Sequence, residues 1–301
     1  MSERIEILFE DDWIVVARKP AGMLSVGYPG YRGKSAQDIL TERYKNRGKI
    51  RIAVIHRLDR ETSGLMVFAK NGEAKKSFMD NWQEIVTERT YRCVCVRARG
   101  AEPLSDSGTI DAPISYNAQD KGYVDKKGDP KAQRAVTRYR VIERGGERDL
   151  LECELETGRK NQIRVHMAHL GHPVSGDSLY GISSNEGGKD EQLALHARVL
   201  AFNHPFTGET LRFEDPEPAF FKTLAGGEPK KGAVKAGTAK VAPDARKLKG
   251  GAPGSRAPSS RAPKERDAKR TEEIRPAAER TAEGKLRPRK GSGGSRFIPG
   301  K

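Results

Sequence analysis

The chain has 301 residues, enough for one large domain or two small ones, and its 35% of hydrophobic residues is low for either. The formal net charge of +15 is unevenly spread, because residues 225–301 hold 21 Lys and Arg against 8 Asp and Glu. No run approaches the roughly 18 apolar residues that cross a bilayer, and acids stand where a secretory leader is basic, so we expect no membrane association. Three cysteines, an odd number, suit a reducing compartment and predict a cytoplasmic protein.

The first 70 residues predict strands and one helix around a polar segment. Alternating apolar residues over 5–9 and the β-rich run over 13–18 predict a hairpin. Ser35, with Asp38 three residues later, is a typical start for a helix over SAQDILTERY. The apolar runs 52–55 and 65–69 predict buried strands, and they enclose the polar segment HRLDRETSG.

The rest of the apolar sequence predicts more strands than helices. A helix is expected at AKKSFMDNW and a second over NQIRVHMAH, which Gly171 and Pro173 end. Further strands are expected at TYRCVCV, AVTRYRVIE, LLECELE, VLAFNH and LRFED. Because these strands follow one another through short turns, we expect an α+β domain with a central mixed, mostly antiparallel sheet and flanking helices.

The composition changes at the end of this region. Residues 225–301 are rich in Gly, Ala, Pro, Ser, Lys and Arg, and Phe297 is their only aromatic. So little apolar surface cannot offset a backbone entropy of roughly 1 to 2 kcal/mol per residue. We therefore predict one domain over 1–224 and a basic, low-complexity, disordered tail over 225–301. Such a tail either solvates the protein or contacts nucleic-acid phosphates.

The segment HRLDRETSG places two bases and an acid directly after a buried strand. In an extended backbone Arg57 and Asp59 point to one side, and His56 and Leu58 to the other. The simpler interpretation is a structural ion pair at a strand end. The functional one is a cleft carboxylate that a basic neighbour keeps ionised, as a nucleophile or base requires. The local sequence leaves both open.

A second polar cluster is TGRKNQIRVHMAHLGHP. Its basic side chains surround a predicted helix start, where a phosphate or carboxylate binds well; they are Arg159, Lys160 and Arg164. Its histidines favour structural hydrogen bonding, and a metal hydrolase is the minor alternative because no cysteine or acid lies in the run; they are His166, His169 and His172. By themselves, Tyr91 and Lys19 are typical of a strand aromatic and a turn lysine. Cys93 and Cys95 share one strand face, as buried thiols do.

Five segments, in this order, resemble the RluA-type family of pseudouridine synthases. They are KPAGMLSV at 19–26, HRLDRETSGLMVFAK at 56–70, ERTYRCVCV at 88–96, TGRKNQIRVHMAHLGHPVSGD at 157–177 and LHARVLAFNHPFTGE at 195–209. The resemblance covers residues 5 to about 224, and HRLDxxTSG is a highly specific signature. It implies the pseudouridine synthase fold, with a catalytic cleft, and isomerisation of particular uridines in ribosomal or transfer RNA.

The resemblance also implies roles for individual residues. Asp59 matches the catalytic aspartate, Tyr91 the tyrosine that stacks on the target uracil, and Arg164 the basic partner of the aspartate. Arg57 matches the arginine that fills the space of a flipped base. Further RNA contacts are expected from Lys19, Arg159, Lys160 and Asn161, the last replacing a histidine common in relatives.

We expect no cofactor and no metal, because uracil is a tolerable leaving group that stays bound between the two bond changes. The partner is RNA and the chain is expected to act as a monomer. A noncatalytic RNA-binding factor with the same fold is the other alternative, which the presence of Asp59 disfavours. The target uridine cannot be read from the sequence.

Overall fold

The computed structural model describes residues 4–181 and 192–226. The chain divides into two units, Met1–Leu248 and Lys249–Lys301, and every described residue lies in the first. Of the predicted disordered tail, residues 227–301 lie outside the described residues. Ala225, which the composition assigned to that tail, is buried against Val94 and Leu150, so the packed part of the chain extends at least one residue past 224.

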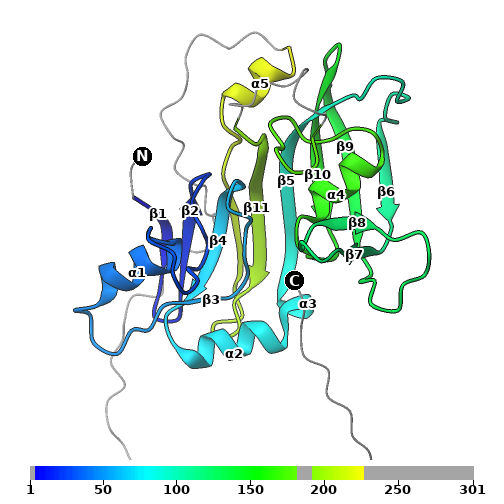
Figure 1. Cartoon of the computed structure of the whole chain (residues 1–301). Helices are drawn as coiled ribbons and strands as arrows, with labels where there is room; N and C mark the ends of the chain where they lie inside the picture. Colours follow the sequence, from blue (N-terminus) through cyan, green and yellow to red (C-terminus); the bar gives the residue numbers. More distant parts are fainter. Residues whose placement is uncertain (1–3, 182–191, 227–301) are drawn as a thin grey trace, which may run out of the picture. The chain divides into compact units, whose positions relative to one another are not determined.

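A sheet of ten strands forms the centre of the described part of the chain (Figure 1). Its strands are β1 (Glu6–Glu10), β2 (Ile14–Lys19), β3 (Ala53–Val54), β4 (Ser63–Ala69), β5 (Val86–Val96), β6 (Ser107–Asp111), β9 (Val136–Arg144), β10 (Arg148–Leu155), β11 (Leu195–Asn203) and β12 (Thr210–Glu214). The order is β1-β2-β4-β11-β5-β10-β9-β6, with β3 paired to β4 and β12 to β11. Among these described strands only β4 and β11 run parallel, which confirms the mixed, mostly antiparallel sheet.

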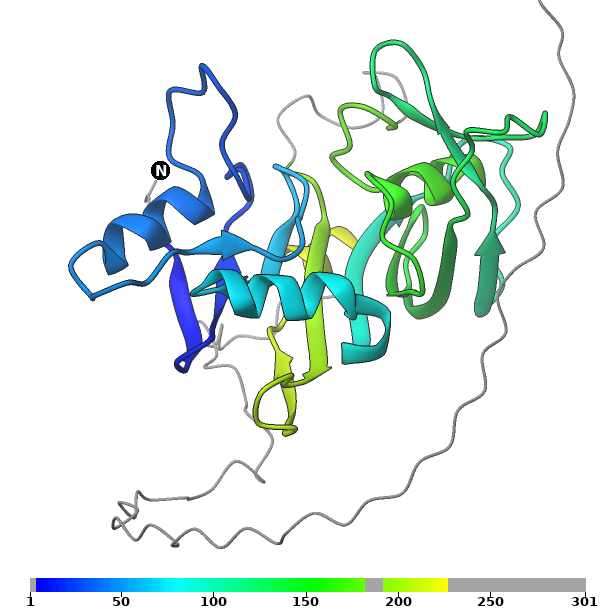
Figure 2. The same cartoon turned by 90° about the horizontal axis from the view of Figure 1, so that it is seen from below.

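Five helices and a small hairpin accompany the sheet in the described residues. The helices are α1 (Ala36–Tyr44), α2 (Gly72–Asp80), α3 (Trp82–Ile85), α4 (Gln162–His169) and α5 (Phe220–Leu224), and the hairpin pairs β7 (Ile114–Tyr116) with β8 (Gly122–Val124). Tyr91 of β5 contacts both the core cluster that holds α1 and the one that holds α4, so the two helices cover the same sheet face. Figure 2 shows both on that side. Val94, one position out of step with Cys93 and Cys95, packs with α5 on the other face.

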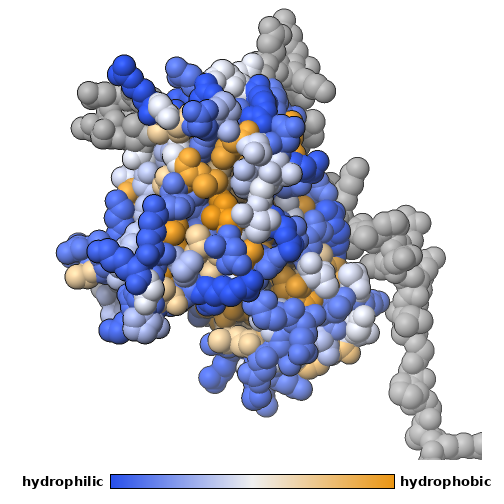
Figure 3. All heavy atoms as spheres, turned by 90° about the vertical axis from the view of Figure 1, so that its right-hand side faces the viewer, coloured by the Kyte–Doolittle hydropathy of each residue, from blue (hydrophilic) through white to orange (hydrophobic). Residues whose placement is uncertain are grey.

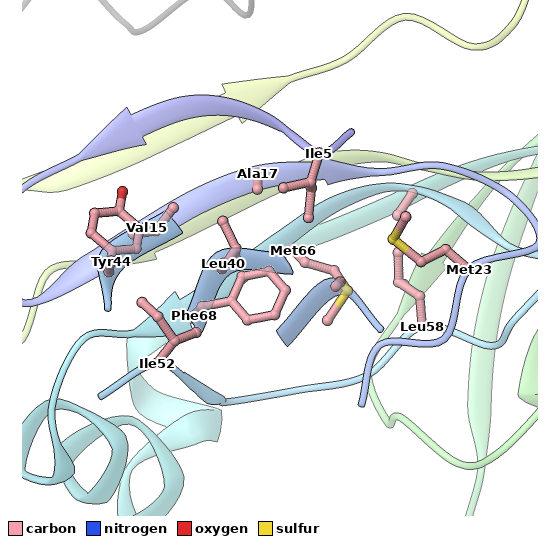
Figure 4. Close-up of a cluster of buried hydrophobic side chains, with 12 residues drawn as sticks. Ile5, Val15, Ala17, Met23, Leu40, Tyr44, Ile52, Leu58, Met66 and Phe68 are labelled. Carbon is pink, nitrogen blue, oxygen red and sulfur yellow. The ribbon is translucent and has the colours of Figure 1, made fainter. Parts of the chain in front are cut away.

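Helix α1 shows how the sequence builds this face. Ser35 accepts from the backbone N–H of Asp38, whose carboxylate accepts from Ser35 in return, so the predicted capping box is present. Leu40 and Tyr44 point from the helix into a cluster with apolar residues of β2 and β4 (Figure 4). Each such burial contributes about 1.5 to 3 kcal/mol. Leu58, the residue before Asp59, lies at one end of the same cluster, so the core holds the segment that carries the candidate carboxylate.

Most predicted elements are confirmed, and a few were missed. The hairpin, the helices α1 and α4 and the five later strands are present, while the helix expected at AKKSFMDNW begins earlier, after Asn71, and breaks at Asn81. Strands β6, β7 and β8 and helix α5 were not predicted. No helix in residues 4–181 or 192–226 is long and apolar enough to span a membrane. Figure 3 shows hydrophilic side chains around a central apolar group on the β6 side.

Candidate active-site cleft

A cleft of about 920 Å³ opens on the face that carries Tyr91. Its walls come from the HRLDR segment, the α2–α3 region, the first half of β5 and the start of α4. The ionisable lining is mainly basic, with six Lys and Arg side chains against two carboxylates; these are Arg57, Arg60, Lys75, Arg89, Arg159, Lys160, Asp59 and Asp120. A concave surface of this charge attracts and holds a polyanion.

Buried contacts on both sides hold the polar loop 56–62 in the cleft. Leu58 is buried in the core, and the ring nitrogen Nε2 of His56 accepts from the backbone N–H of Val67 at 3.1 Å. Burial lowers the pKa of His56 to about 3, with Arg89 contributing, so this imidazole stays neutral and keeps its acceptor. The backbone N–H of Thr62 donates to the carbonyl of Asp59 at 3.1 Å and closes the turn.

The loop ends where the parallel strands β4 and β11 meet. Gly64 has φ +116° there, and a Cβ atom on it would lie 2.3 Å from the carbonyl oxygen of Ala197. Only glycine therefore permits this close approach. Next to it, Ser63 Oγ contacts His196 Nδ1 at 2.8 Å, and His196 Nε2 lies 3.3 Å from the carboxylate of Asp215. Since all three side chains are buried, this network fixes the loop's end to β11 and to the end of β12 and does not face the cleft.

Asp59 is the carboxylate in the interior of the cleft, with 29% of its side chain exposed. Arg164 Nη1 lies 3.9 Å from its Oδ2. Burial raises the pKa of Asp59 above its ordinary value, while Arg164 and then Lys19 oppose this rise. The neighbouring cations favour the ionised, unprotonated form that a nucleophile or base needs.

Arg164 has a second and closer carboxylate partner, Asp177. Its Nε and Nη2 donate to the two oxygens of Asp177, each at 2.7 Å, in a bidentate pair whose members are both buried. Its Nη1, the nitrogen nearest Asp59, also donates to Asn161 Oδ1 at 3.1 Å. The guanidinium lies over the Tyr180 ring, 5.3 Å from the centroid. Asp177, Asn161 and Tyr180 therefore fix the guanidinium of Arg164, and its Nη1 lies beside Asp59.

Asn161 has a structural reason to be an asparagine. It precedes α4 with φ +56° and ψ +21°, a left-handed conformation that Asn tolerates better than most residues. Its amide donates to the Tyr180 hydroxyl at 3.3 Å while its oxygen accepts from Arg164. Asn161, where the family resemblance led us to expect a histidine, thus orients Arg164.

Tyr91 and its neighbours form an aromatic part of the cleft wall. Burial raises the pKa of Tyr91, to which Asp59 adds while Arg89 opposes, so the phenol is neutral at neutral pH. Arg89 donates to the carbonyls of Leu155 and Glu156, each at 3.1 Å, and lies 5.7 Å from the Trp82 ring centroid. An aromatic ring that lines the same cleft as a carboxylate is suited to holding a planar base next to a reacting sugar.

The structure corrects the role expected for Lys19. Its side chain is fully buried and its ammonium donates to three backbone carbonyls, those of Pro20, Met23 and Arg60, at 2.7 to 3.1 Å. Burial lowers its pKa to about 7, with Asp59 opposing. Lys19 therefore joins the KPAG turn to the loop after Asp59 and offers no surface for RNA contact.

The other predicted RNA-contacting residues line the cleft. Arg57 is exposed, and the guanidinium nearest to Asp59 belongs to Arg164. The prediction of a structural ion pair between Arg57 and Asp59 is therefore wrong. Lys160 pairs with Asp120 at the rim, and Arg159 donates to the carbonyl of Arg134 at 2.9 Å. Both side chains remain partly open to solvent.

The histidines and cysteines have structural contacts. His166 uses both ring nitrogens, one with Thr137 Oγ1 and one with the carbonyl of Ala112, each at 2.9 Å. His172 Nε2 contacts the carbonyl of Glu102 at 2.9 Å. Across the described ranges, His, Cys, Asp and Glu side chains form no group with the arrangement of a metal site. The three buried thiols are free, with Cys93 Sγ lying 3.7 Å from the sulfurs of Cys95 and Cys153.

Sequence reasoning missed several residues of this site. Asp177 ends the matched segment TGRKNQIRVHMAHLGHPVSGD, yet nothing in the local pattern pairs it with Arg164. Trp82 and Met79 lie in the helix predicted at AKKSFMDNW, where both were treated only as helix residues. A methionine and a tryptophan so close together at the polar end of a predicted helix were the available signal.

Comparison with known proteins shows the family to which the chain belongs. The family model described as RNA pseudouridylate synthase matches residues 13–169. The uncharacterized RNA pseudouridine synthase YlyB of Bacillus subtilis is 38% identical over 218 residues, covering 71% of this chain and 69% of that protein. The ribosomal large subunit pseudouridine synthase D of Xanthomonas campestris is 37% identical, covering 73% and 68%. The solved structure of human RNA pseudouridylate synthase domain containing 4 superposes with a TM-score of 0.57 at 26% identity, covering 72% and 90%. The chain belongs to the RNA pseudouridylate synthase family, whose members are isomerases.

Proposed function

We propose that Asp59 is the catalytic carboxylate for the conversion of uridine to pseudouridine in RNA, with Arg164 as its charge partner. The observation that carries this is the position of Asp59, which lines a basic cleft together with Tyr91 and lies 3.9 Å from the buried Arg164. The other carboxylate of the cleft lining, Asp120, is exposed at the rim and occupied by Lys160.

The reaction breaks the C1′–N1 glycosidic bond and forms a C1′–C5 bond. The Asp59 carboxylate either adds to C1′ or removes a ribose proton, and uracil leaves with the electron pair on N1. After the base has turned, C5 bonds to C1′ while the Asp59–C1′ bond breaks or, in the second route, while Asp59 returns the ribose proton. The proton on C5 passes to N1, so reactant and product have the same atoms. Both routes need an ionised carboxylate beside a cation, which Arg164 and its fixed Nη1 supply.

The reacting uridine must leave its stack before Asp59 can reach the sugar, at a cost of a few kcal/mol. In our proposal Tyr91 stacks on the extruded uracil and moves the proton on C5. Arg57 fills the space that the uracil has left in the RNA stack. The exposed position of Arg57 and the placement of Tyr91 in the cleft wall support these roles. Arg159 and Lys160 are then placed to contact phosphates.

We propose large-subunit ribosomal RNA as the substrate, in the cytoplasm, because relatives such as the Xanthomonas protein are named for it. We also propose that the chain acts as a monomer. The test is to incubate the purified protein with unmodified transcripts of large-subunit ribosomal RNA and of transfer RNAs, and to map pseudouridine by carbodiimide labelling and primer extension. We expect modification at particular uridines of the ribosomal transcript.

Two results would contradict this proposal at different levels. Modification of transfer RNA alone would overturn the substrate and leave the reaction intact. No modification of either RNA, or of total RNA from cells that lack the gene, would overturn the assignment to Asp59 and the reaction together.

The basic tail is the other part of the chain that we propose contacts RNA. Residues 227–301 hold 21 Lys and Arg against 8 Asp and Glu, since Ala225 and Gly226 carry no charge. Deleting them is expected to weaken RNA binding most at low salt, because each phosphate contact contributes about 0.7 to 0.9 to the slope of log K against log salt. Filter binding of the ribosomal transcript over a salt series measures this. An unchanged slope would mean that the tail does not contact RNA.

A further inference from the structure

The loop over residues 27–34, here called the tyrosine loop, exposes aromatic and basic side chains together. Tyr28 is 63% exposed, more than any other large hydrophobic side chain in the described ranges, and its ring lies 5.5 Å from that of Tyr31 at an angle of 40°. Arg32 and Lys34 are exposed beside them, and neither forms an ion pair within the described residues. One exposed aromatic needs no explanation, but two aromatics interleaved with unpaired cations are typical of a surface for single-stranded nucleic acid.

The tyrosine loop has a fixed base and a defined turn. The first backbone N–H groups of α1, from Ala36 and Gln37, donate to the carbonyls of Leu24 and Ser25 at 2.8 and 3.2 Å, which closes the loop at its ends. At the tip, the N–H of Tyr31 donates to the carbonyl of Tyr28 at 3.0 Å across Gly30, whose φ is +88°. A preformed loop loses little conformational entropy when a ligand binds.

Gly33 makes room for one of the two rings. A Cβ atom on Gly33 would lie 2.6 Å from the Tyr31 hydroxyl, so the Tyr31 ring packs over Gly33 and would have to shift for any larger residue there. Tyr31 is accordingly half-buried, whereas Tyr28 is open to solvent. The pair thus consists of a supported ring and a free one, and the free ring is the one that a base can stack on.

The base of the tyrosine loop is joined to the candidate catalytic loop. Ser25 Oγ donates to the carbonyl of Leu58 at 2.7 Å and accepts from the N–H of the same residue at 3.0 Å. Leu58 directly precedes Asp59, and the residues from Leu24 to Val26 line the cleft. Figure 2 shows this segment, in blue, projecting on the side of the sheet that carries α1 and α4. The surface of the tyrosine loop is therefore continuous with the cleft edge.

We propose that the tyrosine loop binds a nucleotide that flanks the target uridine, by stacking an unpaired base on Tyr28 while Arg32 and Lys34 contact the adjacent phosphates. This rests on the proposed function, because it assumes that RNA occupies the cleft. RNA loops supply unpaired bases next to the modified one, and every base has a face that an aromatic ring can stack on. The tyrosine loop thus adds affinity for single-stranded flanks without reading their sequence.

The test measures binding of a fluorescein-labelled RNA stem-loop, with uridine in its loop, by fluorescence anisotropy on the full chain. Tyr28→Ala is expected to weaken binding about fivefold or more, the lower range of aromatic–base stacking, and to leave the salt slope unchanged. Tyr28→Phe keeps the ring and is expected to bind as the wild type does. The double variant Arg32→Gln/Lys34→Gln is expected to lower the slope of log K against log salt by about 0.7 for each phosphate that the variant no longer neutralises.

Ile142→Ala serves as the matched control, since Ile142 is an exposed apolar residue of β9 outside the cleft lining. Wild-type affinity in Tyr28→Ala, equal weakening in Ile142→Ala or Tyr28→Phe, or no binding of the stem-loop by the wild type at low salt would each overturn the inference. A chain that binds the stem-loop through Tyr28 but forms no pseudouridine in any RNA would refute the proposed function instead.

Discussion

Replacing Asp59 with asparagine is expected to reduce pseudouridine formation by roughly 10⁴-fold or more, as removal of a group that acts on the reacting atoms does. The amide cannot add to C1′ or remove a ribose proton, yet it has nearly the same shape as the carboxyl group. Arg164 keeps its bidentate partner Asp177 in this variant, so the replacement leaves no buried charge unpaired. Single-turnover assays on the ribosomal transcript and filter binding of the same RNA measure the two effects separately.

The same substitution is expected to stabilise the fold at neutral pH. Burial raises the pKa of Asp59, which means that the folded protein disfavours the ionised carboxyl group relative to the unfolded chain. The resulting cost is fully present above the raised pKa, shrinks as pH falls through it, and vanishes below the ordinary pKa of 3.8. Asp59→Asn should therefore unfold at a higher temperature than the wild type near pH 7 and at the same temperature in acid. In the wild type, turnover should fall as pH is lowered through the raised pKa.

Asp120→Asn is the control for both measurements. It removes the other carboxylate of the cleft lining, which is exposed and paired with Lys160, and an exposed pair contributes about 1 kcal/mol or less. Turnover of Asp120→Asn should stay within about tenfold of the wild type. Its unfolding temperature near pH 7 should not show the increase that is expected for Asp59→Asn. Full activity in Asp59→Asn, or equal losses in the two variants, would rule out Asp59 as the reacting group.

Removing Arg164 is expected to have the largest effect on stability. In Arg164→Met the carboxylate of Asp177, which is fully buried, loses its bidentate cation, and breaking a buried pair on one side costs about 3 to 5 kcal/mol. Urea unfolding monitored by tryptophan fluorescence gives the change in unfolding free energy. The two backbone N–H groups that donate to Asp177 Oδ1, from Leu179 and Tyr180, remain and do not replace the missing charge.

The double variant Arg164→Met/Asp177→Asn separates folding from chemistry. Asparagine keeps an oxygen for the backbone donors of Leu179 and Tyr180 and carries no charge, so most of the stability should return. Activity should stay below about one hundredth of the wild type, because Asp59 no longer has its fixed cation. Recovery of activity together with stability would show that Arg164 serves the fold alone.

The sequence was sufficient for the parts of the site that lie on regular elements with strong patterns. The apolar runs before and after HRLDRETSG placed Asp59 between two strands, and they are β3 and β4. The segment NQIRVHMAH, ended by Gly171 and Pro173, predicted α4, and Arg164 lies on it as expected. These predictions succeeded because an uninterrupted apolar run indicates a strand that is buried on both faces, and because Gly and Pro mark the end of a helix locally.

Contacts between distant segments could not be read in the same way. Arg57 is two residues from Asp59, so local reasoning paired them, but the fold places Arg164 there, 105 positions later, and gives Arg164 a closer partner in Asp177. Lys19 looks like a surface turn residue until the carbonyl groups around it are known. Strands β7 and β8 have three residues each, too few to show any period.

The parallel junction of β4 and β11 also bears on when the cleft can exist during synthesis. Ser63 and Gly64 pair with His196 and Ala197, which the ribosome adds more than 130 residues later. Contacts so far apart in sequence form late in folding, after local hairpins. A nascent chain that ends before β11 has Asp59 and even Arg164 but lacks the strand that fixes the end of the Asp59 loop. Isomerase activity should therefore appear only when almost the whole domain has emerged.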